Sequence, residues 1–176
     1  MLILFTFLNM ATKSLILDSK QLQQKIKRIA FEIYERNFKE EKIVLAGIEQ
    51  NGYKFAQLLQ LEINKISGIQ TILLKITLNK STQVQTEIFL DQDIQNFTNS
   101  TIVLTDDVLN TGKVLAFSLQ PFLSIETKKI QTAVIVDRSH QSFPIVADYV
   151  GYSLATTIKE HIEVSLETDN FGVYLH

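Results

Sequence analysis

The sequence predicts an α/β fold in which a mostly parallel, twisted sheet carries helices on both faces. Two observations lead to this prediction. Apolar runs of strand length alternate along the chain with segments whose apolar residues recur at helical spacing. Several of the runs, such as 43–48 and 102–104, are apolar at consecutive positions, which is typical of parallel strands buried on both faces.

The chain begins with a short apolar segment and a long helix. Residues 13–17 form the apolar segment, and Asp18 is a candidate N-cap with Gln21 at the capping-box position. The helix is expected at about 19–37, because apolar residues recur there at helical spacing. These residues are Leu22, Ile26, Ile29, Ala30 and Ile33.

A strand, a helix and another strand should follow. We expect a buried strand at 42–48, a turn at 49–52 and a strand at 69–78. The helix between them should bury Phe55, Leu58, Leu59 and Ile63. The polar segment 79–87 has no apolar period and is expected to be a mobile loop, with a short strand after it at 87–90.

The second half of the chain repeats this alternation. An apolar strand begins at Thr101, and a helix from about Gly112 should end or kink at Pro121. The next strand is expected at 130–136, and the sequence from Asp148 onward indicates short strands and loops.

Composition indicates one domain of ordinary globular type. The chain has 176 residues, of which 45% are hydrophobic and 20% charged. We expect 13–176 to form a single domain and 1–12 to be a non-native extension, with Met10 as a candidate start. A signal or anchor peptide is the alternative, although 1–8 is too short to span a bilayer. The absence of Cys excludes thiol chemistry, the three His form no metal-binding spacing, and the net charge of −2 favours no nucleic acid.

The segment 101–113 carries the strongest functional signal. Asp106 and Asp107 follow a buried strand, at the end where open α/β sheets bind ligands. Gly112 permits a turn with positive φ, and backbone N–H groups in such a turn can bind an anion. Two acids beside a phosphate cradle suit a ligand that has a phosphate at one end and diols with a divalent cation at the other.

This segment resembles the phosphoribosyl pyrophosphate signature of type I phosphoribosyltransferases. Other segments resemble one branch of that family, the bifunctional pyrimidine-operon attenuation regulators with uracil phosphoribosyltransferase activity. They are 15–18, 28–30, 35–37, 46–48, 136–138, His140, 144–145 and 147–151. The resemblance spans about 14–168 and implies the family fold, including a small hood region beside the main sheet.

The resemblance also implies roles for individual residues. Asp106 and Asp107 would be the catalytic acids and would hold Mg²⁺, directly or through water. The ribose 5-phosphate would be bound by Asp106, Asp107, Val108, Leu109, Asn110, Thr111, Gly112 and Lys113. Lys80 would belong to the flexible loop that closes over the site. The pyrophosphate loop would comprise Glu49, Gln50, Asn51 and Gly52.

The base side of the site would contain Asp137, Arg138 and His140. The alternatives are a surface ion pair for Arg138 and an ordinary loop histidine for His140. Asn110 stands where purine-using relatives have an acid, and an amide cannot act as a general base, which argues against a purine substrate.

Three departures from the family pattern weaken the pyrophosphate end of the site. The loop at 49–52 has Glu49 and no cation, although phosphate oxygens prefer Arg or Lys partners. The flexible loop lacks the family's Arg-Asp-Asp run, which leaves Lys80 as its cation. Val114 replaces a hydroxyl residue of the signature.

The leading hypothesis is therefore a phosphoribosyltransferase-like protein that uses Mg²⁺ and binds phosphoribosyl pyrophosphate with uracil, or uridine monophosphate. Transfer to uracil should be inefficient. The alternatives are a nucleotide-responsive RNA-binding regulator and a catalytically degenerate nucleotide-binding protein. RNA binding is not favoured, because the basic residues of the first helix are typical of a solvated helix face. We expect a cytoplasmic homo-oligomer, a homodimer or larger, that does not bind membranes.

Overall fold

The main sheet has the predicted architecture. The computed structural model describes residues 13–79, 87–155, 157 and 160–176. Six strands pair in the order β4-β3-β2-β5-β6-β7, and all neighbours are parallel except β4, which runs antiparallel to β3. The strands are β2 (Lys42–Ile48), β3 (Gln70–Asn79), β4 (Glu87–Leu90), β5 (Thr101–Leu109), β6 (Lys129–Asp137) and β7 (Tyr149–Ser153).

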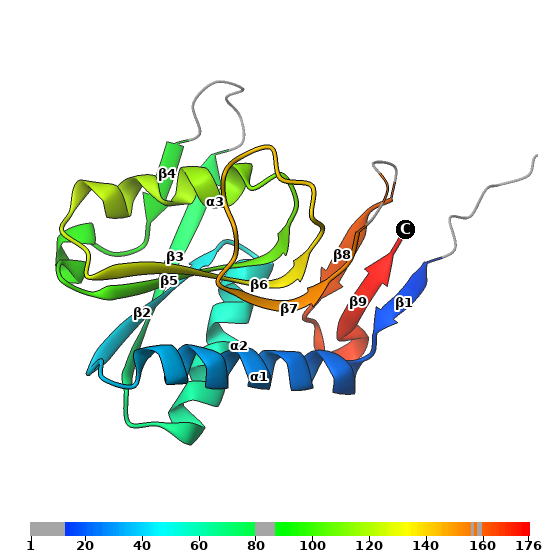
Figure 1. Ribbon diagram of the computed structural model, residues 1–176, viewed down its shortest axis with the longest axis horizontal. Coiled ribbons are helices and arrows are strands. Elements are labelled where there is room, and N and C mark those ends of the chain that lie inside the picture. The colour runs from blue at the N-terminus through cyan, green and yellow to red at the C-terminus, as the bar shows by residue number, and fades with distance from the viewer. Residues whose placement is uncertain (1–12, 80–86, 156, 158–159) are drawn as a thin grey trace, which may run out of the picture.

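Helices cover both faces of this sheet (Figure 1). The long helices α1 (Ser19–Asn37) and α2 (Asn51–Ile66) lie on one face, and the short α3 (Lys113–Ser118) lies on the other. The 3₁₀ turns η1 (Ile94–Phe97) and η2 (Gln120–Ser124) add Phe97 and Phe122 to the core on the side of α3. α3 ends before Pro121, which lies in the first turn of η2, as the missing amide proton requires.

The start of α1 is fixed by the predicted capping box. The Asp18 carboxylate accepts a hydrogen bond of 2.8 Å from the backbone N–H of Gln21, and the Gln21 side chain accepts one of 3.0 Å from the backbone N–H of Asp18. Two amide protons that the helix leaves unpaired are thus satisfied. α1 therefore begins directly after β1 (Ser14–Leu17).

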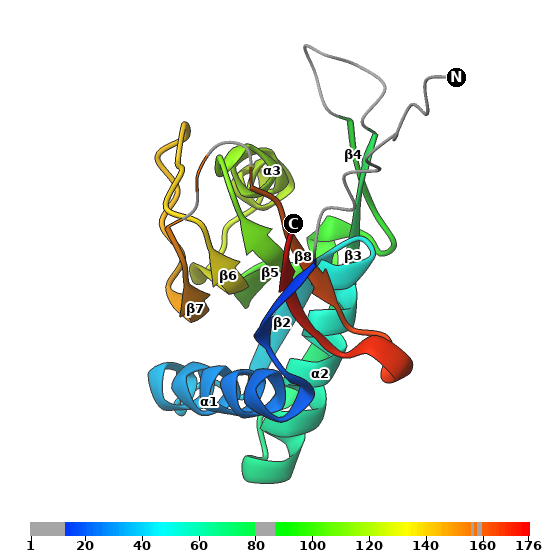
Figure 2. The same cartoon turned by 90° about the vertical axis from the view of Figure 1, so that its right-hand side faces the viewer.

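A second sheet forms the hood. It contains β1, β8 (Ile162–Ser165) and β9 (Gly172–Leu175), antiparallel in the order β1-β9-β8, with the 3₁₀ turn η3 (Thr168–Asn170) between β8 and β9. The two ends of the described chain thus meet in one small sheet, and β8 lies beside the carboxyl end of β5 (Figure 2).

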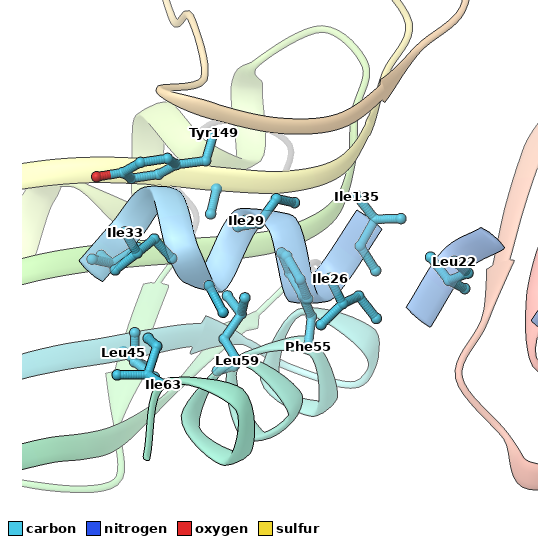
Figure 3. Close-up of a cluster of buried hydrophobic side chains, with 14 of the residues drawn as sticks. Leu22, Ile26, Ile29, Ile33, Leu45, Phe55, Leu59, Ile63, Ile135 and Tyr149 are labelled. Carbon is cyan, nitrogen blue, oxygen red and sulfur yellow. The ribbon is translucent and has the colours of Figure 1, made fainter. Parts of the chain in front are cut away.

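A continuous apolar core joins α1, α2 and the main sheet (Figure 3). α1 contributes Leu22, Ile26, Ile29 and Ile33, which pack with Phe55, Leu59 and Ile63 of α2 and with Leu45, Ile135 and Tyr149 of the sheet. Full burial of such a side chain contributes roughly 1.5–3 kcal/mol. This packing therefore fixes the positions of the strands whose ends carry the functional residues.

The strand β5 extends beyond its apolar run. β5 continues to Leu109, because Asp106, Val108 and Leu109 pair with residues of β6. The two acids are therefore strand residues, not loop residues. The mobile loop expected at 79–87 lies, apart from its ends, outside the described residues.

No helix in the described part of the chain is long and apolar enough to span a membrane.

Candidate functional site

The two acids at the carboxyl end of β5 are held in place by their own backbone. Both are half-buried. The Asp106 carboxylate accepts a hydrogen bond of 3.0 Å from the N–H of Asp107, and the Asp107 carboxylate accepts one of 2.9 Å from the N–H of Val108. These bonds restrict both side chains at the sheet edge.

The loop 49–52 packs directly against this strand end. The Thr105 hydroxyl donates a hydrogen bond of 2.8 Å to the Gly52 carbonyl. A Cβ on Gly52 would lie 2.7 Å from the Thr105 carbonyl oxygen, so only glycine fits this position. Gln50, the residue before α2, has φ 63° and ψ −113°, a conformation that residues other than glycine rarely adopt. Strain of this kind concentrates in loops that bind ligands.

Two side chains of this loop have definite partners. The Asn51 amide nitrogen donates to the Asp107 carboxylate at 2.9 Å and to the Val164 carbonyl of β8 at 2.8 Å. The Glu49 carboxylate accepts a weak hydrogen bond of 3.4 Å from the N–H of Leu78, at the end of β3. Asn51 therefore faces the acids and the hood, whereas Glu49 is turned toward β3.

A cavity of ≈ 290 Å³ lies between the main sheet and the hood. Its lining comes from the first residue of α2, the end of β5 and the residue after it, the residue after β6, and β8 with the residue before it. The lining residues are Asn51, Asp107, Val108, Asn110, Arg138, His161, Ile162, Glu163 and Val164. The cavity is near the lower size limit of small-molecule sites.

Arg138 ties the other wall of the cavity to the chain that leads into β8. Its side chain is buried, and one guanidinium nitrogen donates to the carbonyls of Glu160 at 2.7 Å and Thr157 at 3.3 Å. Its backbone N–H donates to the Leu109 carbonyl at 3.0 Å. Arg138 is therefore a buried side chain that donates to backbone carbonyls, not an exposed one.

The segment 110–113 forms a tight turn above the sheet. Gly112 has φ +79°, and its position is enclosed by Phe143 and Ile145. The Thr111 carbonyl accepts hydrogen bonds of 2.9 Å and 3.0 Å from the N–H groups of Ser142 and Phe143. The expected positive φ at Gly112 is confirmed, and the segment 142–145 supports the turn from outside.

Glu163, in strand β8 of the hood, carries a charged carboxylate at neutral pH. A hydrogen bond from Lys13 and a second from His176 hold the pKa of Glu163 below its usual value. The distances are 3.0 Å from Lys13 Nζ and 2.7 Å from His176 Nε2. Because the folded pKa is lowered, this pairing stabilises the hood above the unfolded pKa and is lost as pH falls through the folded value.

Comparison with known proteins decides the family. The family model for the phosphoribosyl transferase domain matches residues 13–169. The chain belongs to the phosphoribosyltransferase family. It is 38% identical over 167 residues to the bifunctional protein PyrR of Clostridioides difficile (strain 630), covering 89% of this chain and 93% of that protein. It is 31% identical over 163 residues to PyrR of Haemophilus ducreyi, covering 88% and 90% of the two chains.

Solved structures show the same fold. A hypoxanthine-guanine phosphoribosyltransferase from Bacillus anthracis superposes with a TM-score of 0.74 at 20% identity, covering 92% of this chain and 96% of that one. A hypoxanthine phosphoribosyltransferase from Trypanosoma cruzi superposes with a TM-score of 0.77 at 14% identity, covering 92% and 89%. The predicted fold class and the resemblance to the branch of bifunctional regulators are both confirmed.

The structure brings together residues from three of the expected groups. The cavity lining includes Asp107, Val108 and Asn110 of the signature, Asn51 at the start of α2, and Arg138. Other expected residues lie outside the described lining. Leu109 is buried in the core on the side of α3, and Lys80 lies outside the described residues. The Asp137 carboxylate accepts a hydrogen bond of 2.8 Å from the N–H of Ser139.

The hood wall was not among the expected site residues. His161, Ile162, Glu163 and Val164 line the cavity, but they match no motif. Their alternation of polar and apolar residues is a strand signal that could have indicated one wetted face. It could not have shown that this strand lines a cavity with Asp107, since that depends on how the hood docks.

The donor set fits Mg²⁺ only as a metal shared with a ligand. The described residues contain no group of three or more His, Asp or Glu side chains able to hold a metal. Asp106 and Asp107 offer hard carboxylate oxygens, and Mg²⁺ is commonly bound by one or two carboxylates together with substrate oxygens and water. A metal in this site would therefore arrive with its ligand.

Proposed function

We propose that this protein binds phosphoribosyl pyrophosphate or a pyrimidine nucleotide in the cavity between β5 and the hood, and that it transfers phosphoribosyl to uracil with reduced efficiency. The observation that carries the proposal is the meeting of Asp107, Asn110 and Arg138 with the hood strand around a single cavity. In a member of the phosphoribosyltransferase family, this is where a ribose phosphate and a base would meet.

Each part of the site would have one task. Asp106 and Asp107 would hold the ribose hydroxyls, and the turn 110–113 would anchor the 5′-phosphate through backbone N–H groups and the Thr111 hydroxyl. The hood would cover the base and exclude water. Mg²⁺, when bound with the ligand, would neutralise charge on the departing pyrophosphate.

The reduced efficiency follows from the charges around the loop 49–52. A departing pyrophosphate is stabilised by cations placed where its charge develops. Asn51 is neutral, and its amide protons are already donated to Asp107 and Val164. The backbone N–H groups at the start of α2 remain as phosphate donors, assisted by the helix dipole.

The test is turnover of uracil with phosphoribosyl pyrophosphate, with and without Mg²⁺. We expect slow, Mg²⁺-dependent turnover that Asn51→Arg increases, because the variant supplies the missing charge. Asn64→Arg adds the same charge near the far end of α2 and is the matched control. Fast wild-type turnover that Asn51→Arg leaves unchanged would contradict the reduced-efficiency part. Nucleotide binding without turnover would favour a catalytically degenerate binding protein.

A second candidate, the nucleotide-responsive RNA-binding regulator, is supported by the PyrR relatives. The contacts of Arg28 in α1 do not favour RNA binding. The Arg28 guanidinium donates to the carbonyls of Val150 at 2.7 Å and Gly151 at 3.0 Å and pairs with Glu32, so it is engaged in covering β7. The proposal takes the protein to be a cytoplasmic homo-oligomer, as the family resemblance implies.

A further inference from the structure

Asn51 makes the one direct side-chain link between Asp107 and the hood strand in the described part of the chain. Its amide nitrogen lies 2.9 Å from the Asp107 carboxylate and 2.8 Å from the Val164 carbonyl. An amide nitrogen carries two protons, so both are used. The remaining polar atom of the side chain is an acceptor, which cannot donate to a phosphate.

The hydrogen bonds of the Asn51 amide to Asp107 and Val164 therefore compete with phosphate binding by the same amide. A pyrophosphate group bound at the loop 49–52 could accept a hydrogen bond from the Asn51 amide only if that amide released Asp107 or β8. A ligand that ends at its 5′-phosphate, held at the turn 110–113, makes no such demand. The link to Val164 would then remain, and the hood would stay closed over the cavity.

We propose that Asn51 is a positioning residue that fastens β8 to Asp107 and thereby favours a nucleoside monophosphate over phosphoribosyl pyrophosphate. This inference rests on the proposed function for its ligands, but the link itself can be tested without any ligand. Arg138, which donates to the carbonyls of Glu160 and Thr157, fixes the chain that leads into β8 from the opposite wall. β8 and the chain before it are thus bonded to both sides of the cavity.

The first experiment measures the link directly. Hydrogen exchange of the peptide that covers β8 is followed in the ligand-free protein. We expect faster exchange in Asn51→Ala than in wild type, whereas Asn64→Ala, in the last third of α2, should leave β8 unchanged. Equal exchange in wild type and Asn51→Ala would overturn the inference, whatever the ligand proves to be.

The second experiment measures selectivity by calorimetry with uridine monophosphate and phosphoribosyl pyrophosphate, each with Mg²⁺. Asn51→Ala no longer holds Asp107 and β8 in place for the ligand, so we expect roughly tenfold weaker binding of the monophosphate, the order of one hydrogen bond to a charged group. Affinity for phosphoribosyl pyrophosphate should be unchanged or higher. An unchanged ratio of the two affinities would overturn the selectivity. If wild type binds neither ligand, the proposed function fails, and the exchange result still decides the link.

Discussion

Substitution of Gly52 by alanine should separate the loop 49–52 from the end of β5. The new Cβ would lie 2.7 Å from the Thr105 carbonyl oxygen and 3.2 Å from the Asp106 Cα, both of them backbone atoms that cannot rotate away. The loop or the strand must therefore shift. Either movement displaces Asp106, which the proposal assigns to ribose binding.

The magnitude follows from two opposing terms. Overpacking of a close contact typically costs ~1–3 kcal/mol. Replacing Gly by Ala inside a helix gains up to ~1 kcal/mol. We therefore expect a net loss of ~1–2 kcal/mol in the free energy of unfolding, which for a chain of this size lowers Tm by ~2–8 °C.

Urea denaturation of Gly52→Ala and Gly68→Ala measures this difference. Gly68 is the control, because a Cβ there meets no atom within 4 Å. Gly68→Ala should be unchanged or up to ~1 kcal/mol more stable than wild type. If Gly52→Ala is as stable as Gly68→Ala and binds nucleotide as wild type does, a Cβ at position 52 does not displace the loop or β5.

Two further predictions concern titration and RNA. Burial raises the pKa of Tyr149 to about 12, so its stabilising effect is complete below the unfolded pKa near 10 and is lost as pH rises toward the folded value. Urea denaturation of wild type should therefore show ~1 kcal/mol more loss between pH 9 and pH 11 than Tyr149→Phe, and equal losses would contradict this. RNA binding should be weak or absent in a filter assay at about physiological salt. Tight, sequence-specific binding that Lys27→Ala abolishes would make the regulator the leading hypothesis.

The elements of the main sheet were predictable because each depends on local chemistry. The capping box at Asp18, the consecutive apolar residues of β2 and the break before Pro121 are consequences of neighbouring residues. The positive φ of Gly112 was predictable for the same reason. The sequence also indicated the edge at which Asp106 and Asp107 would lie.

The contacts that close the site between the main sheet and the hood were not predictable from the sequence. The sequence predicts a pyrophosphate loop at 49–52 that lacks a cation, but it does not predict the bond from Asn51 to Val164, which joins residues far apart in the chain. The sequence leaves Arg138 open as a base-side residue or a surface ion pair, and the structure buries it with hydrogen bonds to the carbonyls of Thr157 and Glu160. Both contacts depend on how the hood docks, which no local pattern records.

In the proposed function, Asp106 and Asp107 hold the ribose of a Mg²⁺-linked nucleotide. Calorimetry of uridine monophosphate with Mg²⁺ tests these two roles, using wild type, the double variant Asp106→Asn with Asp107→Asn, and the exposed control Asp169→Asn. We expect Mg²⁺-dependent binding to wild type and to the control, and strong loss in the double variant because ribose and metal contacts are removed together. Equal affinity of wild type and the double variant would show that these two acids do not hold the ribose.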